Sequence, residues 1–131
     1  MINSVLAEAR IMGFIPSSKP DEAKKFYSEM LGLDFFAEDE YGLMFSINNT
    51  STLRVQKARD WKPQPFTIFG WEVENISGAV QSLIDRGVKF ENFGFPSQDA
   101  QGICTFENGD QVAWFKDPDG NTLSIAQLVR K

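Results

Sequence analysis

One pattern of helix, glycine and strand occurs twice in the chain. Apolar residues are spaced as on one helix face from Ala23 to Leu31, and Gly32 follows them. The same spacing runs from Ile76 to Ile84 and is followed by Gly87. Each glycine precedes an aliphatic residue, a charged residue and a phenylalanine, and the glycines are 55 residues apart (87 − 32). A repeat of this length predicts two modules, neither of which buries its sheet alone.

Runs of apolar and β-branched residues surround both helices and predict short strands. In the first copy the runs cover residues 8–16, 33–37, 43–47 and 52–56. In the second copy they cover 66–73, 88–93, a short ribbon at 103–106, and two strands within 112–128. Ser18 and Asp21 have the spacing of a capping box at the first helix, and Asn75 can cap the second.

These elements predict the α+β class, with two tandem βαβββ modules that form an open, curled mixed β-sheet cleft. We expect a single domain over residues 1–131, with module one at about 8–57, a linker at about 58–65 and module two at about 66–129. The linker is assigned because 58–65 holds two prolines and three charged residues. A ferredoxin-like sandwich would account for one module but not for the repeat.

The last two strands surround a turn with the sequence Asp117-Pro118-Asp119-Gly120. Proline fixes φ near −65° at the first corner, and glycine accepts the positive φ that lets the second strand leave. The flanking residues alternate between two faces with period 2. We therefore expect a hairpin in which alternate residues see two different environments.

Composition excludes several classes of function. The chain has no histidine, which removes imidazole acid–base catalysis and most transition-metal sites. The net charge is −5 with no basic run, so nucleic-acid binding is not expected. Mean hydropathy is −0.27 without a long apolar run or a signal peptide, so no membrane contact is expected. A single cysteine, Cys104, fits a reducing compartment, and we expect a cytoplasmic protein.

Three segments resemble the vicinal oxygen chelate superfamily. They are FYSEMLGLDF, WEVENISGAVQSLIDRGVKF and AWFKDPDGNTLSI, and the resemblance covers roughly residues 10–127. The superfamily includes glyoxalase I, extradiol dioxygenases, and fosfomycin and bleomycin resistance proteins. The resemblance implies the two-module fold, and it implies a homodimer because members commonly pair. It does not imply one activity, since this fold hosts many.

The resemblance also indicates where a metal would be held. The ligand positions of the metal enzymes correspond to Met12, Ile68 and Ser124 of this chain, at or next to those residues. A thioether, an alkyl group and a neutral hydroxyl supply neither charge nor imidazole. We therefore expect no metal and no other cofactor.

The expected inner face of the cleft carries the candidate ligand-binding residues. By the assumed strand alternation, Ala113 joins this face, while Trp71 and Trp114 face the helix. Most of the inner-face set is apolar, as in small-molecule pockets, although the same residues could fill the cleft as core. The candidates are Met12, Phe14, Ile68, Gly70, Glu72, Phe115 and Ser124.

Three functions remain open at this point. The first is a metal-independent small-molecule-binding protein of the glyoxalase/bleomycin resistance type, whose partner is a small organic molecule. The second is a metal-free lyase or isomerase in which Glu72, the one acid expected on the inner face, acts as a base. The third is a structural or regulatory dimer whose cleft is filled by side chains.

Overall fold

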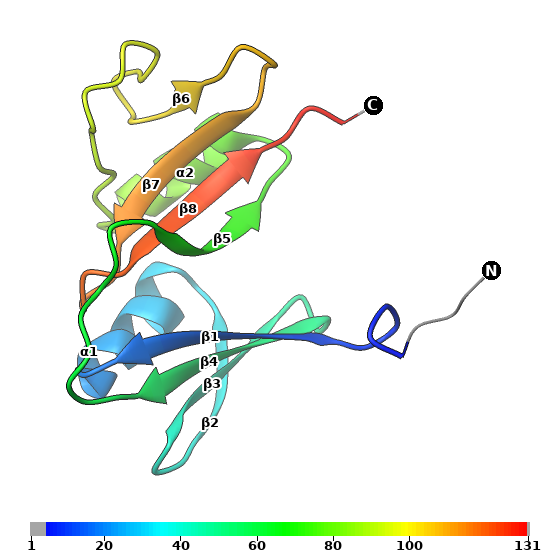
Figure 1. Cartoon of the computed structure of the whole chain (residues 1–131), viewed down its shortest axis with the longest axis vertical. Coiled ribbons are helices and arrows are strands. Elements are labelled where there is room, and N and C mark those ends of the chain that lie inside the picture. Colours follow the sequence, from blue (N-terminus) through cyan, green and yellow to red (C-terminus); the bar gives the residue numbers. More distant parts are fainter. Residues whose placement is uncertain (1–4, 131) are drawn as a thin grey trace. The chain divides into compact units, whose positions relative to one another are not determined.

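The computed structural model describes residues 5–130 of the 131-residue chain (Figure 1). The chain divides after Asp60 into two compact units, here called unit 1 and unit 2. This division falls within the segment that was expected to be a linker. Within residues 5–130, no helix is long and apolar enough to span a membrane.

Unit 1 is a βαβββ module with a mixed sheet in the order β1-β4-β3-β2. β1 pairs parallel with β4, and the other pairs are antiparallel. One sheet face is buried against the helical segment, through Ile15, Phe45 and Leu53 of the sheet and Tyr27 of the helix. The elements are β1 (Ile11–Ser17), α1 (Pro20–Lys25), η1 (Phe26–Met30), β2 (Asp34–Glu38), β3 (Gly42–Ile47) and β4 (Ser51–Lys57).

The start of the first helix differs from the sequence prediction. The capping box at Ser18 and Asp21 is wrong, because the N-cap is Lys19 and no side chain caps it. Pro20 occupies the first turn, and a residue before proline is forced into an extended conformation, so the helix begins there. The helix ends as the single π-turn of η1, and Gly32 follows with φ 76°, as its position predicted.

Unit 2 repeats the arrangement, with a mixed sheet in the order β5-β8-β7-β6. β5 pairs parallel with β8, and α2 lies behind this sheet in Figure 1, which leaves the near face without a helix. The predicted cap is confirmed, because Asn75 Oδ1 accepts a hydrogen bond from the backbone N–H of Gly78 at 3.1 Å. The elements are β5 (Thr67–Glu72), α2 (Ile76–Asp85), β6 (Cys104–Thr105), β7 (Gln111–Lys116) and β8 (Thr122–Gln127).

The predicted strand at 88–93 is wrong. Only Phe90 makes a β-bridge there, with Phe115, and β6 has just two residues. The side chain of Gln98 instead makes hydrogen bonds to backbone groups of this segment. Its Nε2 donates to the carbonyl oxygens of Glu91 and Gly102, both at 2.8 Å, and its Oε1 accepts from the N–H of Phe93 at 2.9 Å. Residues 91–103 therefore form a loop in which one side-chain amide satisfies three backbone groups.

The turn between β7 and β8 has the predicted conformation, with Gly120 at φ 90°. Its centre is the buried carboxylate of Asp117. Oδ1 accepts from the backbone N–H of Asp119 at 3.0 Å and of Asn121 at 2.9 Å, while Oδ2 accepts from Asn121 Nδ2 at 2.9 Å. The same turn thus fixes the residues on both sides of it, Lys116 and Thr122, which are paired across the strands.

Candidate ligand-binding site

The open face of the unit 2 sheet is centred on three residues that lie side by side on neighbouring strands. Gly70 of β5 is paired with Ser124 of β8, which in turn is paired with Trp114 of β7. A Cβ added to Gly70 would lie 2.4 Å from Ser124 Oγ and 3.0 Å from the carbonyl oxygen of Ser124. The space left by the glycine is therefore taken by the serine side chain.

The structure reverses the predicted faces of β7. Phe115 was expected beside the ligand, but it is 0% exposed on the face covered by α2, and Ala113 is buried with it. Phe115 stacks on Trp71, with ring centroids 6.4 Å apart, so the prediction that Trp71 faces the helix is confirmed. The prediction for Trp114 is wrong, because its pairing with Ser124 places it on the open face. Alternation fixes which residues share a face but not which face is covered.

A pocket of about 380 Å³ opens on unit 2 beside Trp114. This volume is at the small end of the range for organic-ligand sites. All of its walls come from unit 2, and four of the eight lining residues are aromatic. The lining consists of Pro65, Phe66, Thr67, Phe93, Phe95, Trp114, Lys116 and Thr122.

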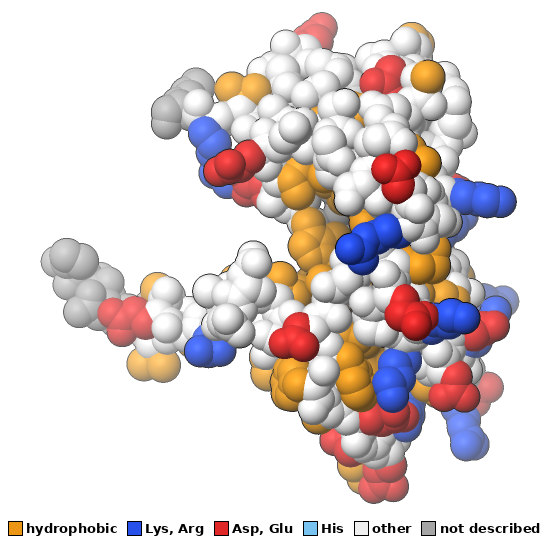
Figure 2. All heavy atoms as spheres, turned by 180° about the vertical axis from the view of Figure 1, so that it is seen from behind, with side chains coloured by type: hydrophobic (Ala, Val, Ile, Leu, Met, Phe, Trp, Pro, Cys, Tyr) orange, Lys and Arg blue, Asp and Glu red, His pale blue; other side chains and the backbone are white. Residues whose placement is uncertain are grey.

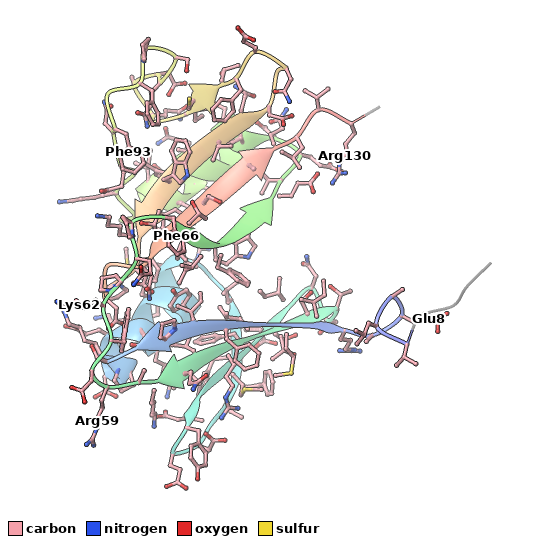
Figure 3. The ribbon with its side chains drawn as sticks, viewed as in Figure 1. Glu8, Arg59, Lys62, Phe66, Phe93 and Arg130 are labelled. Atoms are coloured by element: carbon pink, nitrogen blue, oxygen red, sulfur yellow. The ribbon has the colours of Figure 1, made fainter. Side chains whose placement is uncertain are left out.

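The aromatic side chains form a cluster with free surface. The ring centroid of Trp114 lies 5.4 Å from that of Phe93 and 6.0 Å from that of Phe95, both edge to face. Phe93 and Phe95 remain 46% exposed, and Phe66 remains 58% exposed. Figure 3 labels Phe66, immediately before β5, and Phe93, in the loop between α2 and β6. Aromatic rings that line a concavity yet stay this exposed are typical of binding surfaces rather than of a core.

The loop that carries two of these rings is fixed by hydrogen bonds. The side-chain amide of Gln98 accepts from the N–H of Phe93 and donates to the carbonyl oxygen of Glu91. The N–H of Glu91 in turn donates to the carbonyl oxygen of Trp114 at 2.8 Å. Phe93 is therefore tied to the strand that carries Trp114 through the side-chain amide of Gln98 and the backbone of Glu91. These hydrogen bonds hold the loop in place although the rings of Phe93 and Phe95 are exposed.

Most of the residues that line this pocket were not predicted from the sequence. A signal was present, since Phe90, Phe93 and Phe95 lie close together around Gly94 in a stretch that is otherwise polar. Their spacing fits neither a strand nor a helix face, which is typical of a loop that presents side chains to a ligand. The sequence instead predicted a strand over 88–93, followed by a loop over 94–102 with no assigned role.

Glu72 does not have the environment that its proposed role as a base requires. Its side chain is 42% exposed and forms an ion pair with Arg130, which follows β8 (Figure 3). Arg130 Nε donates to Glu72 Oε2 at 2.9 Å, and a second guanidinium nitrogen donates to Oε1. This contact raises the pKa of Arg130 above its ordinary value, first through the hydrogen bond and then through charge. The carboxylate is thus solvated and bound at both oxygens.

The two candidates in unit 1 lie on its open sheet face. Met12 is 48% exposed and Phe14 is 54% exposed on β1, and the register places Phe14 next to Arg54 of β4. Arg54 Nη1 donates to Met44 Sδ at 3.2 Å, and Nη2 donates to Asp39 Oδ1 at 3.3 Å. This face combines apolar side chains with one guanidinium that is only partly exposed.

Asp39 holds this arrangement at the turn before β3. Its Oδ1 also accepts from the backbone N–H groups of Tyr41 at 2.7 Å and Gly42 at 2.9 Å. The hydrogen bond from Tyr41 is the largest of the effects that lower the pKa of the Asp39 carboxyl. The bond from Gly42 and the charge of Arg54 lower this pKa further, and desolvation by burial opposes them.

The residues at the metal positions do not fit a metal ion. Met12 and Ile68 carry no anionic or imidazole donor, and Ser124 places its hydroxyl against Gly70. Ile68 also falls at the register irregularity between Thr67 and Phe69. In the part of the chain that the structure describes, no three Asp, Glu, Cys or His side chains could hold a metal together.

Comparison with known proteins agrees with this fold. Solved structures of similar fold include a glyoxalase/bleomycin resistance protein/dioxygenase from Alicyclobacillus acidocaldarius, at 16% identity and a TM-score of 0.72, covering 94% of this chain and 93% of that one. A superfamily member from Sphaerobacter thermophilus has 19% identity and a TM-score of 0.71, covering 95% and 100%. A lactoylglutathione lyase from Agrobacterium tumefaciens has 15% identity and a TM-score of 0.67, covering 92% and 93%.

At these identities the solved structures establish the fold alone. No curated protein sequence matches the chain. The family model for the Glyoxalase/Bleomycin resistance protein/Dioxygenase superfamily matches residues 9–125, which is nearly the whole chain. The chain therefore belongs to the glyoxalase/bleomycin resistance protein/dioxygenase superfamily.

Proposed function

We propose that this protein binds a small organic molecule without a metal ion, in the aromatic pocket of unit 2. The observation that carries the proposal is the group of rings around one concavity, in which the exposed Phe66, Phe93 and Phe95 surround the half-buried Trp114. Burying such rings under a ligand is favourable by roughly 25 cal/mol per Å² of apolar surface. Ser124 neighbours Trp114 on the same face and stays in the proposed site, together with Gly70.

The chemistry of the lining favours binding over catalysis. Lys116 is the only titratable side chain among the pocket residues. General acid–base catalysis needs a group that can take and return a proton within hydrogen-bond reach of the substrate. Glu72 is not among the lining residues, and Arg130 binds both of its oxygens. A lyase or isomerase mechanism therefore has little support from this pocket.

The site chemistry also supports metal independence. The superfamily's metal positions carry methionine, isoleucine and serine here, and these donors do not suit Zn²⁺, Ni²⁺, Mn²⁺ or Fe²⁺. We accordingly expect purified protein to contain less than one equivalent of these metals by elemental analysis. One bound equivalent would contradict this part of the proposal.

A thermal-shift screen tests the proposal. Protein treated with EDTA is screened against a library of metabolites and antibiotics, and each hit is repeated on Trp114→Leu and Trp71→Phe. Both variants lose indole contacts in unit 2, but Trp71 packs against Phe115 on the opposite sheet face. We expect hits that Trp114→Leu abolishes and Trp71→Phe retains. Hits that appear only after metal is added, or that ignore Trp114, would overturn the proposal.

The exposed face of unit 1 favours pairing of two copies as a second element of the proposal. Met12, Phe14 and Phe36 are each about half exposed, and large apolar side chains at this exposure are typical of surfaces that become covered. We propose a cytoplasmic homodimer. Light scattering at micromolar concentration checks the dimer, and a monomer mass would contradict it.

We also propose that the protein does not bind nucleic acid. On the face drawn in Figure 2, acidic and basic side chains are interspersed and no continuous basic patch is present.

A further inference from the structure

We infer that the pocket in unit 2 selects planar aromatic anions, such as aryl carboxylates, and that Lys116 supplies the counter-charge. This inference rests on the proposed function, because it names the chemical class of the ligand for the same pocket. It adds a claim about charge, which the aromatic walls alone do not make.

The shape of the pocket favours flat rings. Phe93 and Phe95 meet Trp114 edge to face, with their own ring centroids 5.9 Å apart, yet each stays 46% exposed, so ring surface is left for a ligand. Phe66, immediately before β5, adds a further ring. A planar ligand can lie against such faces and can present its ring edge to another, the two arrangements that aromatic groups prefer. About 380 Å³ accommodates a molecule of two or three fused rings.

The charge of the pocket favours an anion. Lys116 is the only charged residue in the lining, and no acid accompanies it there. It forms an ion pair with Glu91, in which Nζ and Oε1 are separated by 3.8 Å and the Lys116 and Glu91 side chains are 49% and 34% exposed. An ion pair of this length and exposure contributes little, so the ammonium group is available to a ligand. The whole chain has a net charge of −5, so attraction of an anion depends on this local lysine.

The position of Lys116 matches the position of the rings. It is the second residue after Trp114 on β7 and therefore points to the same open face. Its strand partner is Thr122, which also lines the pocket and has a buried hydroxyl-bearing side chain. A carboxylate at this end can accept from an ammonium and a hydroxyl while its ring lies toward Trp114. The turn at Asp117 holds both polar residues in register.

The inference is tested by comparing 2-naphthoate with 2-naphthamide. The two molecules have nearly the same shape, and only the first is charged at pH 7.5. Dissociation constants are measured by calorimetry with the full chain in EDTA at 50 mM and 300 mM salt. We expect 2-naphthoate to bind about fivefold more tightly at low salt, with the difference reduced at high salt. Equal affinities would overturn the inference.

Three charge variants separate the role of Lys116 from a general charge effect. Lys116→Gln is expected to weaken 2-naphthoate about fivefold and to leave 2-naphthamide unchanged. Glu91→Gln removes the competing acid and is expected to tighten 2-naphthoate about twofold. Lys89→Gln changes an exposed lysine outside the pocket and should have no effect. Circular dichroism melting confirms that each variant is folded.

The outcomes distinguish this inference from the proposed function. If 2-naphthamide and neutral library compounds bind as well as 2-naphthoate, and Trp114→Leu abolishes them all, the proposed function stands and the charge selection fails. If no aromatic compound of either kind binds, both fail. If Lys116→Gln and Glu91→Gln shift the affinity in the same direction, the electrostatic argument is wrong even when 2-naphthoate binds.

Discussion

The buried carboxylate of Asp117 gives the sharpest prediction about how the pocket is held. It accepts three hydrogen bonds of 2.9–3.0 Å, two from backbone N–H groups and one from the amide of Asn121, which is 1% exposed. Asp117→Ala leaves these donors without their acceptor in a place that water reaches poorly. At roughly 1–3 kcal/mol for a buried group left unsatisfied, we expect a loss of about 3 kcal/mol in the free energy of unfolding.

Asp117→Asn provides the matched comparison. Its amide oxygen keeps an acceptor for the two backbone N–H groups, but its nitrogen faces the side-chain nitrogen of Asn121 unless that amide turns over. We expect a loss of about 1–2 kcal/mol, since one hydrogen bond and the charge of the acceptor are lost. The free energy of unfolding is therefore expected to decrease in the order wild type, Asp117→Asn, Asp117→Ala.

Urea unfolding measures these differences, and a double-mutant cycle with Asn121→Ala isolates the side-chain pair. We expect the cycle to show a coupling energy of about 1 kcal/mol or more, since the two residues are in direct contact. The melting temperature of Asp117→Ala should fall by about 10 °C for a chain of this length. A loss below about 1 kcal/mol for Asp117→Ala, or additive single mutants, would refute the reasoning.

Three further predictions concern other fixed points of the two units. Gln98→Ala should raise amide hydrogen exchange at Phe93 and weaken ligand binding, because one amide makes three backbone contacts in that loop; unchanged exchange would contradict this. Gly70→Ala should cost about 1–3 kcal/mol, since its Cβ would lie 2.4 Å from Ser124 Oγ and 3.0 Å from the Ser124 carbonyl; urea unfolding measures it, and wild-type stability would contradict it. The folded-state pKa of Asp39 is lowered, so its contribution to the free energy of unfolding is present above the unfolded-state pKa and is lost as the pH falls through the folded-state pKa. Asp39→Asn should therefore flatten the acid side of a curve of stability against pH. An acid side that is unchanged in this variant would contradict the prediction.

Local signals in the sequence predicted several elements of the fold. Asn75 caps α2, and Gly120 takes positive φ in the last turn, because both effects depend on a few neighbouring residues. The repeat predicted the two βαβββ units for a related reason, since helix periodicity is visible within each copy. The family model over residues 9–125 agrees with that prediction.

The candidate site was harder to predict, because its parts depend on contacts between distant segments. Period 2 places Trp114 and Phe115 on opposite faces but does not say which face α2 covers. The answer comes from the pairing of Trp114 with Ser124 and from Phe115 stacking on Trp71. The aromatic loop was missed because the side chain of Gln98 replaces the strand pairing that the apolar residues suggested.

A titration followed by two-dimensional ¹H–¹⁵N NMR tests the central claim most directly. The indole N–H signals are assigned with the Trp114→Leu and Trp71→Phe variants, and the EDTA-treated protein is titrated with 2-naphthoate and with the strongest hit of the thermal-shift screen. We expect a saturable shift of the Trp114 signal and little change at Trp71. A Trp114 signal that does not move for any compound, or that moves only after a metal is added, would contradict metal-independent binding at this pocket.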